Sequence, residues 1–146
     1  MTDPTYKVEY NTNKDHYKFE SIGPNGKISK IVILSEMESG TYNLGFGDYD
    51  LQTETISDKV VSDNGDMVKV LATVISIATK FLSENPMTYV YIKGSDVVRT
   101  QLYQRIIKRY YDDLIVSHEI YGLINKSFEP FQKNKSYESF LIRKLF

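Results

Sequence analysis

The chain has 146 residues, a net charge of −1, 41% apolar and 25% charged residues, and no cysteine. This composition is ordinary for a globular protein with one continuous core, and we expect a single domain over residues 1–146. The lack of cysteine excludes disulfides, thiolate nucleophiles, iron–sulfur clusters and cysteine-based zinc sites.

Charge is distributed unevenly along the chain. Residues 1–66 contain 6 Lys/Arg against 12 Asp/Glu, whereas residues 67–146 contain 12 against 7. Such asymmetry can mark a basic face for nucleic acid or for an acidic partner, or two halves that lie side by side and neutralise each other. The N-terminus lacks the basic and apolar regions of a signal peptide, and no segment is apolar enough to span a bilayer. We therefore expect a cytoplasmic protein.

The first half of the chain predicts strands. Residues 1–14 are polar and aperiodic, which is typical of a loose arm or an edge strand. A Gly-Pro-Asn-Gly turn joins the alternating segment His16–Gly23 to the β-branched run Lys27–Met37, which indicates a hairpin. Thr41–Phe46 predicts a third strand, and Leu51–Val61 either a short fourth strand or a returning loop.

A helix follows these strands. Residues 62–66, Ser-Asp-Asn-Gly-Asp, offer several N-caps, and apolar residues then recur at three- and four-residue steps from Met67 to Leu82. Asn85-Pro86 ends this helix, and Met87–Lys93 alternates as a strand does.

The remaining elements complete the predicted fold. A second helix runs from about Ser95 to Tyr111 and stops at the acidic pair 112–113. Ile115–Leu123 is strand-like, Ser127–Gln132 contains a proline and predicts an edge or irregular piece, and Tyr137–Leu145 is a strand or a short helix. The order β-β-β-α-β-α-β-β indicates an α+β domain with two helices packed on a largely antiparallel sheet.

The segment 88–111, TYVYIKGSDVVRTQLYQRIIKRYY, contains the candidate site. A strand that leads through a Gly94–Ser95 turn into a helix points several backbone N–H groups at one spot, where anions are favoured. At about 100° per residue, Arg99 lies near the centre of the apolar arc of this helix, so its charge faces the protein body. That arc comprises Val98, Leu102, Tyr103, Ile106, Ile107 and Tyr110.

An inward arginine needs a partner, because an unpaired buried charge is costly. One alternative is a ligand phosphate or carboxylate, held by Arg99 together with Ser95 and the N–H groups after Gly94. The other is an internal carboxylate that staples the fold. Four aspartates at a strand end or a helix start could supply it: Asp48, Asp50, Asp63 and Asp66.

Metal and cofactor sites are not expected. A two-histidine centre would need His16, His118 and a carboxylate such as Glu119, and the histidines belong to separate predicted strands. Asp48 and Asp50 lie on one side of an extended chain, which suits a divalent cation or the cap of a turn.

Two other patterns suggest nucleic acid. Arg99 as phosphate clamp, Tyr103 as acid and His118 as base could form a metal-independent ribonuclease acting on RNA or a nucleotide. The alternative, which we favour, is that His118 is an ordinary surface residue of a strand. The second pattern is the mixture of cations and tyrosines along the second helix, which is typical of a nucleic-acid surface or of a solvated face. These residues are Arg105, Lys108 and Arg109 with Tyr103, Tyr110 and Tyr111.

Several phrases carry a family resemblance: NLGFGDYD (43–50), DNGD (63–66), KVLATV (69–74), KGSDVVRTQLYQR (93–105), IYGL (120–123) and YESFLIRK (137–144). Over nearly its whole length, the chain resembles a family of small bacterial proteins catalogued as a domain of unknown function. The resemblance implies a bacterial, cytoplasmic, stand-alone domain. It brings no activity, cofactor or catalytic residue.

We therefore expect a non-enzymatic binding or interaction domain with an anion pocket at Gly94, Ser95 and Arg99. Its expected partner is another protein, with nucleic acid as the second candidate. Small domains of this size often work in two-gene cassettes, including toxin–antitoxin pairs, which is an argument by analogy alone.

Overall fold

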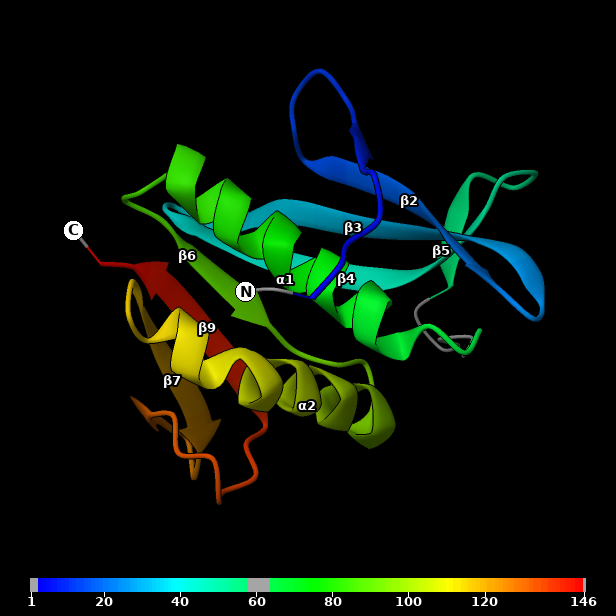
Figure 1. Cartoon of the computed structure of the whole chain (residues 1–146). Helices are drawn as coiled ribbons and strands as arrows, with labels where there is room; N and C mark the ends of the chain where they lie inside the picture. Colours follow the sequence, from blue (N-terminus) through cyan, green and yellow to red (C-terminus); the bar gives the residue numbers. More distant parts are fainter. Residues whose placement is uncertain (1–2, 58–63, 146) are drawn as a thin grey trace.

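The computed structural model describes residues 3–57 and 64–145. Within these ranges, two helices lie on one face of a mixed, mostly antiparallel sheet of nine strands (Figure 1). This confirms the predicted α+β class and the predicted order of the elements. The strands are β1 (Glu9–Tyr10), β2 (His16–Gly23), β3 (Gly26–Glu38), β4 (Thr41–Asp50), β5 (Thr55–Ser57), β6 (Tyr89–Ile92), β7 (His118–Ile124), β8 (Ser127–Pro130) and β9 (Ser139–Lys144), and the helices are α1 (Met67–Glu84) and α2 (Val97–Leu114).

The sheet places the two halves of the chain side by side. Its strand order is β1-β2-β3-β4-β6-β9-β7-β8, and β5 pairs with β4. Among the paired strands of the described ranges, only β4 and β6 run parallel, and they belong to opposite halves of the chain. A parallel pair needs a crossover connection, and α1 provides it.

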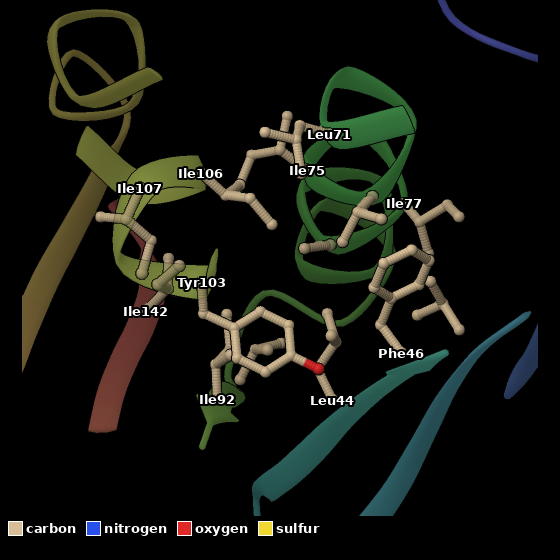
Figure 2. Packing of buried hydrophobic residues seen from close by; sticks show 14 of the residues in the cluster. Leu44, Phe46, Leu71, Ile75, Ile77, Ile92, Tyr103, Ile106, Ile107 and Ile142 are labelled. Carbon is tan, nitrogen blue, oxygen red and sulfur yellow. The ribbon is translucent and has the colours of Figure 1, made fainter. Parts of the chain in front are cut away.

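The core lies between the helices and the covered face of the sheet. The three- and four-residue spacing of the apolar residues in α1 brings Val70, Val74 and Ala78 onto one buried side. Figure 2 shows this packing from close by, with Tyr103 reaching from α2 toward Leu44 of β4. The labelled residues come from both helices and three strands: Leu44, Phe46, Leu71, Ile75, Ile77, Ile92, Tyr103, Ile106, Ile107 and Ile142.

The residue at the N-cap of α1 does not cap the helix with its side chain. Asp66 occupies the N-cap position but makes no capping bond with its side chain. Its carboxylate accepts instead from the hydroxyls of Tyr6 and Ser21, the latter at 2.6 Å. Asn64 donates to the Gly26 carbonyl over 2.8 Å, so the polar segment before α1 ties the β2–β3 hairpin to the helix. The other predicted caps, residues 62–63, lie outside the described residues.

The second helix is longer than predicted at its C-terminal end. It continues past the acidic pair 112–113 to Leu114, because Leu114 is buried while both aspartates remain exposed. Val98 was predicted to lie on the buried apolar arc, and this prediction is wrong. The Val98 side chain is 76% exposed, because the first turn of α2 does not bury it. Neither helix in the described part of the chain is long and apolar enough to cross a membrane.

The N-terminal arm is held against the helices. Its only strand in the described residues is the two-residue β1 at the sheet edge. Before β1, the Tyr6 amide donates to Thr73 Oγ1 of α1 over 2.9 Å, and the Tyr110 hydroxyl of α2 donates to the Asp3 carboxylate over 2.8 Å. Residues 9–10 thus form a short edge strand, and the described residues before them make polar contacts with α1 and α2.

Candidate functional site

An open pocket of about 750 Å³ lies where β6 ends and α2 begins. It extends from the face of the sheet that the helices leave uncovered to the first turn of α2. Its described lining contains two cations and no carboxylate or histidine. The lining residues are Ile33, Ser35, Met37, Asn43, Leu44, Gly45, Phe46, Ile56, Tyr91, Lys93, Gly94, Ser95, Arg99 and Tyr103.

The turn before α2 brings the predicted site residues together. Val90 and Ile92 are buried in the core, so the alternate residues Tyr91 and Lys93 belong to the opposite face of the sheet. The turn is tight at Gly94, where a Cβ atom would lie 2.3 Å from the Thr100 amide nitrogen of α2. Only glycine allows the helix to begin this close to the end of the strand.

Asp96 caps α2. Its backbone is extended, and its carboxylate accepts a hydrogen bond from the Arg99 N–H over 2.8 Å. Asp96 is thus an N-cap of the ordinary kind. One of the N–H groups that the sequence assigned to an anion therefore already bonds to this aspartate. The electrostatic character of the pocket depends on its side chains more than on the helix N-terminus.

Arg99 faces inward, as its place on the helix predicted. It is 5% exposed, and its Nη1 donates to the backbone carbonyl of Phe46 in β4. On this edge of β4, residues 41–44 pair with β6 and residues 48–50 pair with β5, so Phe46 lies between the two pairing strands. The guanidinium thus bonds to the sheet edge between β6 and β5.

The aspartates considered as partners for Arg99 make other contacts. Asp48 pairs with Lys30, whose Nζ lies 2.6 Å from its Oδ1. Asp50 accepts from two backbone amides in the turn after β4, the closer at 2.8 Å. This is the turn-capping role considered for Asp50. Asp66 holds Tyr6 and Ser21 as described above, and Asp63 lies outside the described residues.

Four pocket residues were not recognised as site residues in the sequence. Ser35, Asn43 and Tyr91 are directly paired across β3, β4 and β6, so their side chains share one face of the sheet. Lys93 follows on the same face of the chain as Tyr91 and is exposed. The alternation of Tyr89, Tyr91 and Lys93 was visible in the sequence, but the register of three strands was not.

The structure does not bring His118 together with Arg99 and Tyr103. Arg99 is in the first turn of α2, whereas His118 lies next to Leu114 at the last. Fifteen residues at about 1.5 Å each separate the two ends by roughly 22 Å, too far for both side chains to contact one reacting group. His118 is buried, and its Nδ1 lies 2.9 Å from Oγ of Ser117. Burial lowers the pKa of His118 below its usual value.

The other residues considered for metal binding are also apart. His16 lies beside Asp15 at the start of β2, with 2.9 Å between Nδ1 and the carboxylate. Glu119 accepts from Arg143 and Tyr121 on the uncovered face of the sheet. In the part of the chain that the structure describes, no group of three His, Cys, Asp or Glu side chains could hold a metal ion.

The basic surface of α2 lacks exposed aromatic rings at two of the three expected positions. Tyr103 and Tyr110 are both buried, so they contribute to the core. Arg109 pairs with Asp3 of the N-terminal arm at 3.3 Å, while Arg105 and Lys108 are exposed. Arg105, Lys108 and Arg109 are therefore solvated or tied to the arm, and neither Tyr103 nor Tyr110 offers a stacking platform.

Comparison with protein families identifies the chain. Residues 2–145 match the model described as a family of unknown function, DUF6934, and the chain belongs to that family. No curated protein and no solved structure gave a significant match.

Proposed function

We propose that this member of a family of unknown function is a binding domain that takes an anionic group in the pocket at the end of β6. The observation that supports the proposal most strongly is the charge of the described lining, which includes Lys93 and Arg99 and no carboxylate. A pocket with this balance favours phosphate or carboxylate groups over cations or neutral ligands.

Each polar residue has a distinct role in the proposed site. Lys93 is exposed and supplies a mobile ammonium charge, whereas Arg99 is fixed by its bond to Phe46 and contributes positive charge from the wall. Ser95 is exposed and lies beside them in the pocket lining. The pocket volume of about 750 Å³ lies within the range of small-ligand sites.

Binding is favoured over catalysis by the composition of the pocket. Arg99 and Tyr103 could clamp and protonate a phosphate ester, but the described lining offers no histidine or carboxylate as a base. His118 lies at the far end of α2. A non-enzymatic role, with the anion carried by another protein or by a nucleic acid, therefore fits the pocket better than the ribonuclease alternative. The cytoplasmic location and the two-gene cassette stay predictions from the sequence.

Isothermal titration with inorganic pyrophosphate at low salt tests the proposal. We expect binding with a dissociation constant of about 1 mM or tighter, which corresponds to roughly 4 kcal/mol. Lys93→Ala should weaken binding at least about fivefold through loss of one charge-assisted contact, and Ser95→Ala should weaken it less.

Lys108→Ala is the matched control, because it removes the same charge from the exposed side of α2. It should bind pyrophosphate as the wild type does. Absence of binding in the wild type, or equal affinity in Lys93→Ala, would contradict the proposal.

A further inference from the structure

The pocket is part of a longer concave surface. A second pocket of about 660 Å³ lies next to it, and the two share Ile33 of β3 and Ile56 of β5. The lining residues Lys18, Ile33 and Tyr49 alternate with core residues of β2, β3 and β4, so they belong to the face opposite the two helices, which Figure 1 shows on one side of the sheet. We call this surface the open groove. It leads from Lys93, just after β6, to Tyr49 near the end of β4 and Tyr10 on the edge strand β1.

One end of the open groove combines an aromatic ring with hydrogen-bonding groups and positive charge. Tyr91 lies in register with Asn43 and Ser35, so a ring, an amide and a hydroxyl form a row across three strands. The ring of Phe128 contacts Tyr91 edge-on, with centroids 6.5 Å apart and an interplanar angle of 82°. This contact fixes the orientation of the Tyr91 ring beside Lys93.

The other end of the open groove contains a second ring with a cation. The Lys18 ammonium lies 4.2 Å from the centroid of the Tyr49 ring, and both residues line the second pocket. Glu9 is paired with Lys18 across β1 and β2, and Glu54 also lines this pocket, so its described lining has two carboxylates and one lysine. Among the described lining residues, the excess of cations over carboxylates therefore lies at the Lys93 end.

The middle of the open groove is apolar and shallow. On β4, Gly45 lies opposite Ile33 and Gly47 opposite Ile31, so isoleucine side chains form much of the floor between the two rings. From Asn43 to Tyr49 the strand spans six residues, or about 20 Å. This length exceeds that of one nucleotide and suits a short extended strand of a polymer.

We infer that the open groove binds single-stranded nucleic acid, an inference that rests on the proposed anion pocket. One backbone phosphate lies at Lys93 and Ser95, the adjacent base stacks on Tyr91, and the strand continues over Ile33 and Ile56 toward Lys18 and Tyr49. Rings on an open sheet, flanked by amides and cations, are the features by which proteins hold unpaired bases. An acidic peptide without aromatic residues would use the cations but would have no flat ring to stack on Tyr91.

Fluorescence anisotropy with a labelled eight-nucleotide strand, as RNA and as DNA, tests the inference. Stacking on one tyrosine corresponds to a loss of roughly fivefold to a hundredfold when the ring is removed. Tyr91→Leu should therefore weaken oligonucleotide binding at least fivefold, while Tyr91→Phe keeps the ring and should stay within about twofold of wild type. Pyrophosphate affinity is measured in both variants as well, so that any change at the anion pocket is separated from the loss of the stacked base.

Salt dependence gives a second readout that a folding defect would not produce. For single strands, the slope of log K against log salt is about −0.7 per phosphate contacted. Two contacts, one at Lys93 and one at Lys18, therefore predict a slope of about −1.4. Lys93→Ala should reduce the magnitude of this slope by about 0.7, whereas Lys108→Ala should leave it unchanged.

The outcomes separate the inference from the proposed function. Lys93-dependent pyrophosphate binding, combined with equal oligonucleotide affinity in wild type and Tyr91→Leu, would overturn the inference and leave the anion pocket intact. Tighter binding of an acidic peptide than of the oligonucleotide would also overturn it. Absence of pyrophosphate binding would contradict the proposed function itself, together with the inference that rests on it.

Discussion

Arg99 of α2 donates a hydrogen bond from its guanidinium to the backbone carbonyl of Phe46 in β4. The carbonyl lies between the segment of β4 that pairs with β6 and the segment that pairs with β5. One side chain therefore joins the first turn of α2 to the sheet and places a positive charge in the wall of the pocket. Its structural role and its proposed binding role are coupled.

Replacing Arg99 should affect both roles. In Arg99→Ala, the Phe46 carbonyl loses a donor in a buried position, and we expect the free energy of unfolding to fall by about 1–3 kcal/mol. The domain should still fold, because the free energy of unfolding of single domains is commonly about 5–15 kcal/mol. Urea denaturation followed by circular dichroism measures the change. The exposed Arg105→Ala on the same helix should stay within about 0.5 kcal/mol of wild type, and an equal loss in both variants would contradict the account.

Gly94→Ala should disturb the start of α2. The new methyl group would lie 2.3 Å from the Thr100 amide nitrogen and 2.7 Å from the Arg99 carbonyl carbon, both of which are backbone atoms. Overpacking of this kind costs about 1–3 kcal/mol. We expect a lower melting temperature and weaker pyrophosphate binding, measured by calorimetry. Val97→Ala, three residues further on and 72% exposed, should stay close to wild-type stability. An unchanged melting temperature in Gly94→Ala would show that the strand and the helix are not packed as described.

Lys30 forms a buried ion pair that stabilises the sheet from its covered face. Its side chain is 0% exposed, and its Nζ lies 2.6 Å from Asp48, whose side chain is 18% exposed. Lys30→Met leaves Asp48 without this counter-charge and should cost about 3 kcal/mol. The double variant Lys30→Met/Asp48→Asn should recover part of the loss, and a double-mutant cycle in urea measures the coupling. Additive effects of the two substitutions would rule out the coupling that we infer.

Parts of the site with a local signal could be predicted from the sequence. The inward direction of Arg99 followed from the helical period, which relates residues three and four apart. The Gly94–Ser95 turn followed from a strand pattern that changes within a few residues into a helical one. Lys30 had a similar signal that was missed, because it is in phase with Val32 and Leu34 in a strand of alternating burial.

The remaining features depend on pairing between distant segments. The Phe46 carbonyl is 53 residues from Arg99 in the sequence. It can accept from Arg99 because the pairing of β4 with β6 ends before Phe46 and the pairing of β4 with β5 begins after it. Likewise, Ser35, Asn43 and Tyr91 form a row only in the observed register of β3, β4 and β6. Strand register is not fixed by local periodicity, so the open groove could not be derived from the sequence.

His118 should make the stability of the domain depend on pH. Burial lowers its pKa in the folded protein, and the positive charge of Lys144 acts in the same direction, while the Leu114 carbonyl opposes them. The unfolded chain therefore binds a proton more readily, and stability should fall as pH decreases from about 6.5 toward the lower folded pKa. Acidic groups whose pKa is lowered in the folded protein, such as Glu119, also stabilise the fold, and this stabilisation is lost at lower pH than that of His118.

Urea midpoints at pH 7.5 and pH 5.5 measure this effect. The wild-type midpoint should fall between the two conditions, and His118→Gln should show a smaller fall, because the side chain that titrates is absent. A fall of equal size in wild type and His118→Gln would assign the pH dependence to other groups.

The central claim is the anion site at the turn between β6 and α2, and the most direct measurement is an amide nitrogen–proton NMR titration with pyrophosphate. We predict that the largest saturable shifts occur at the amides of Lys93, Gly94, Ser95 and Arg99, and that Lys93→Ala reduces them while Lys108→Ala does not. Shifts that are absent, or that are largest on the exposed side of α2, would contradict the account.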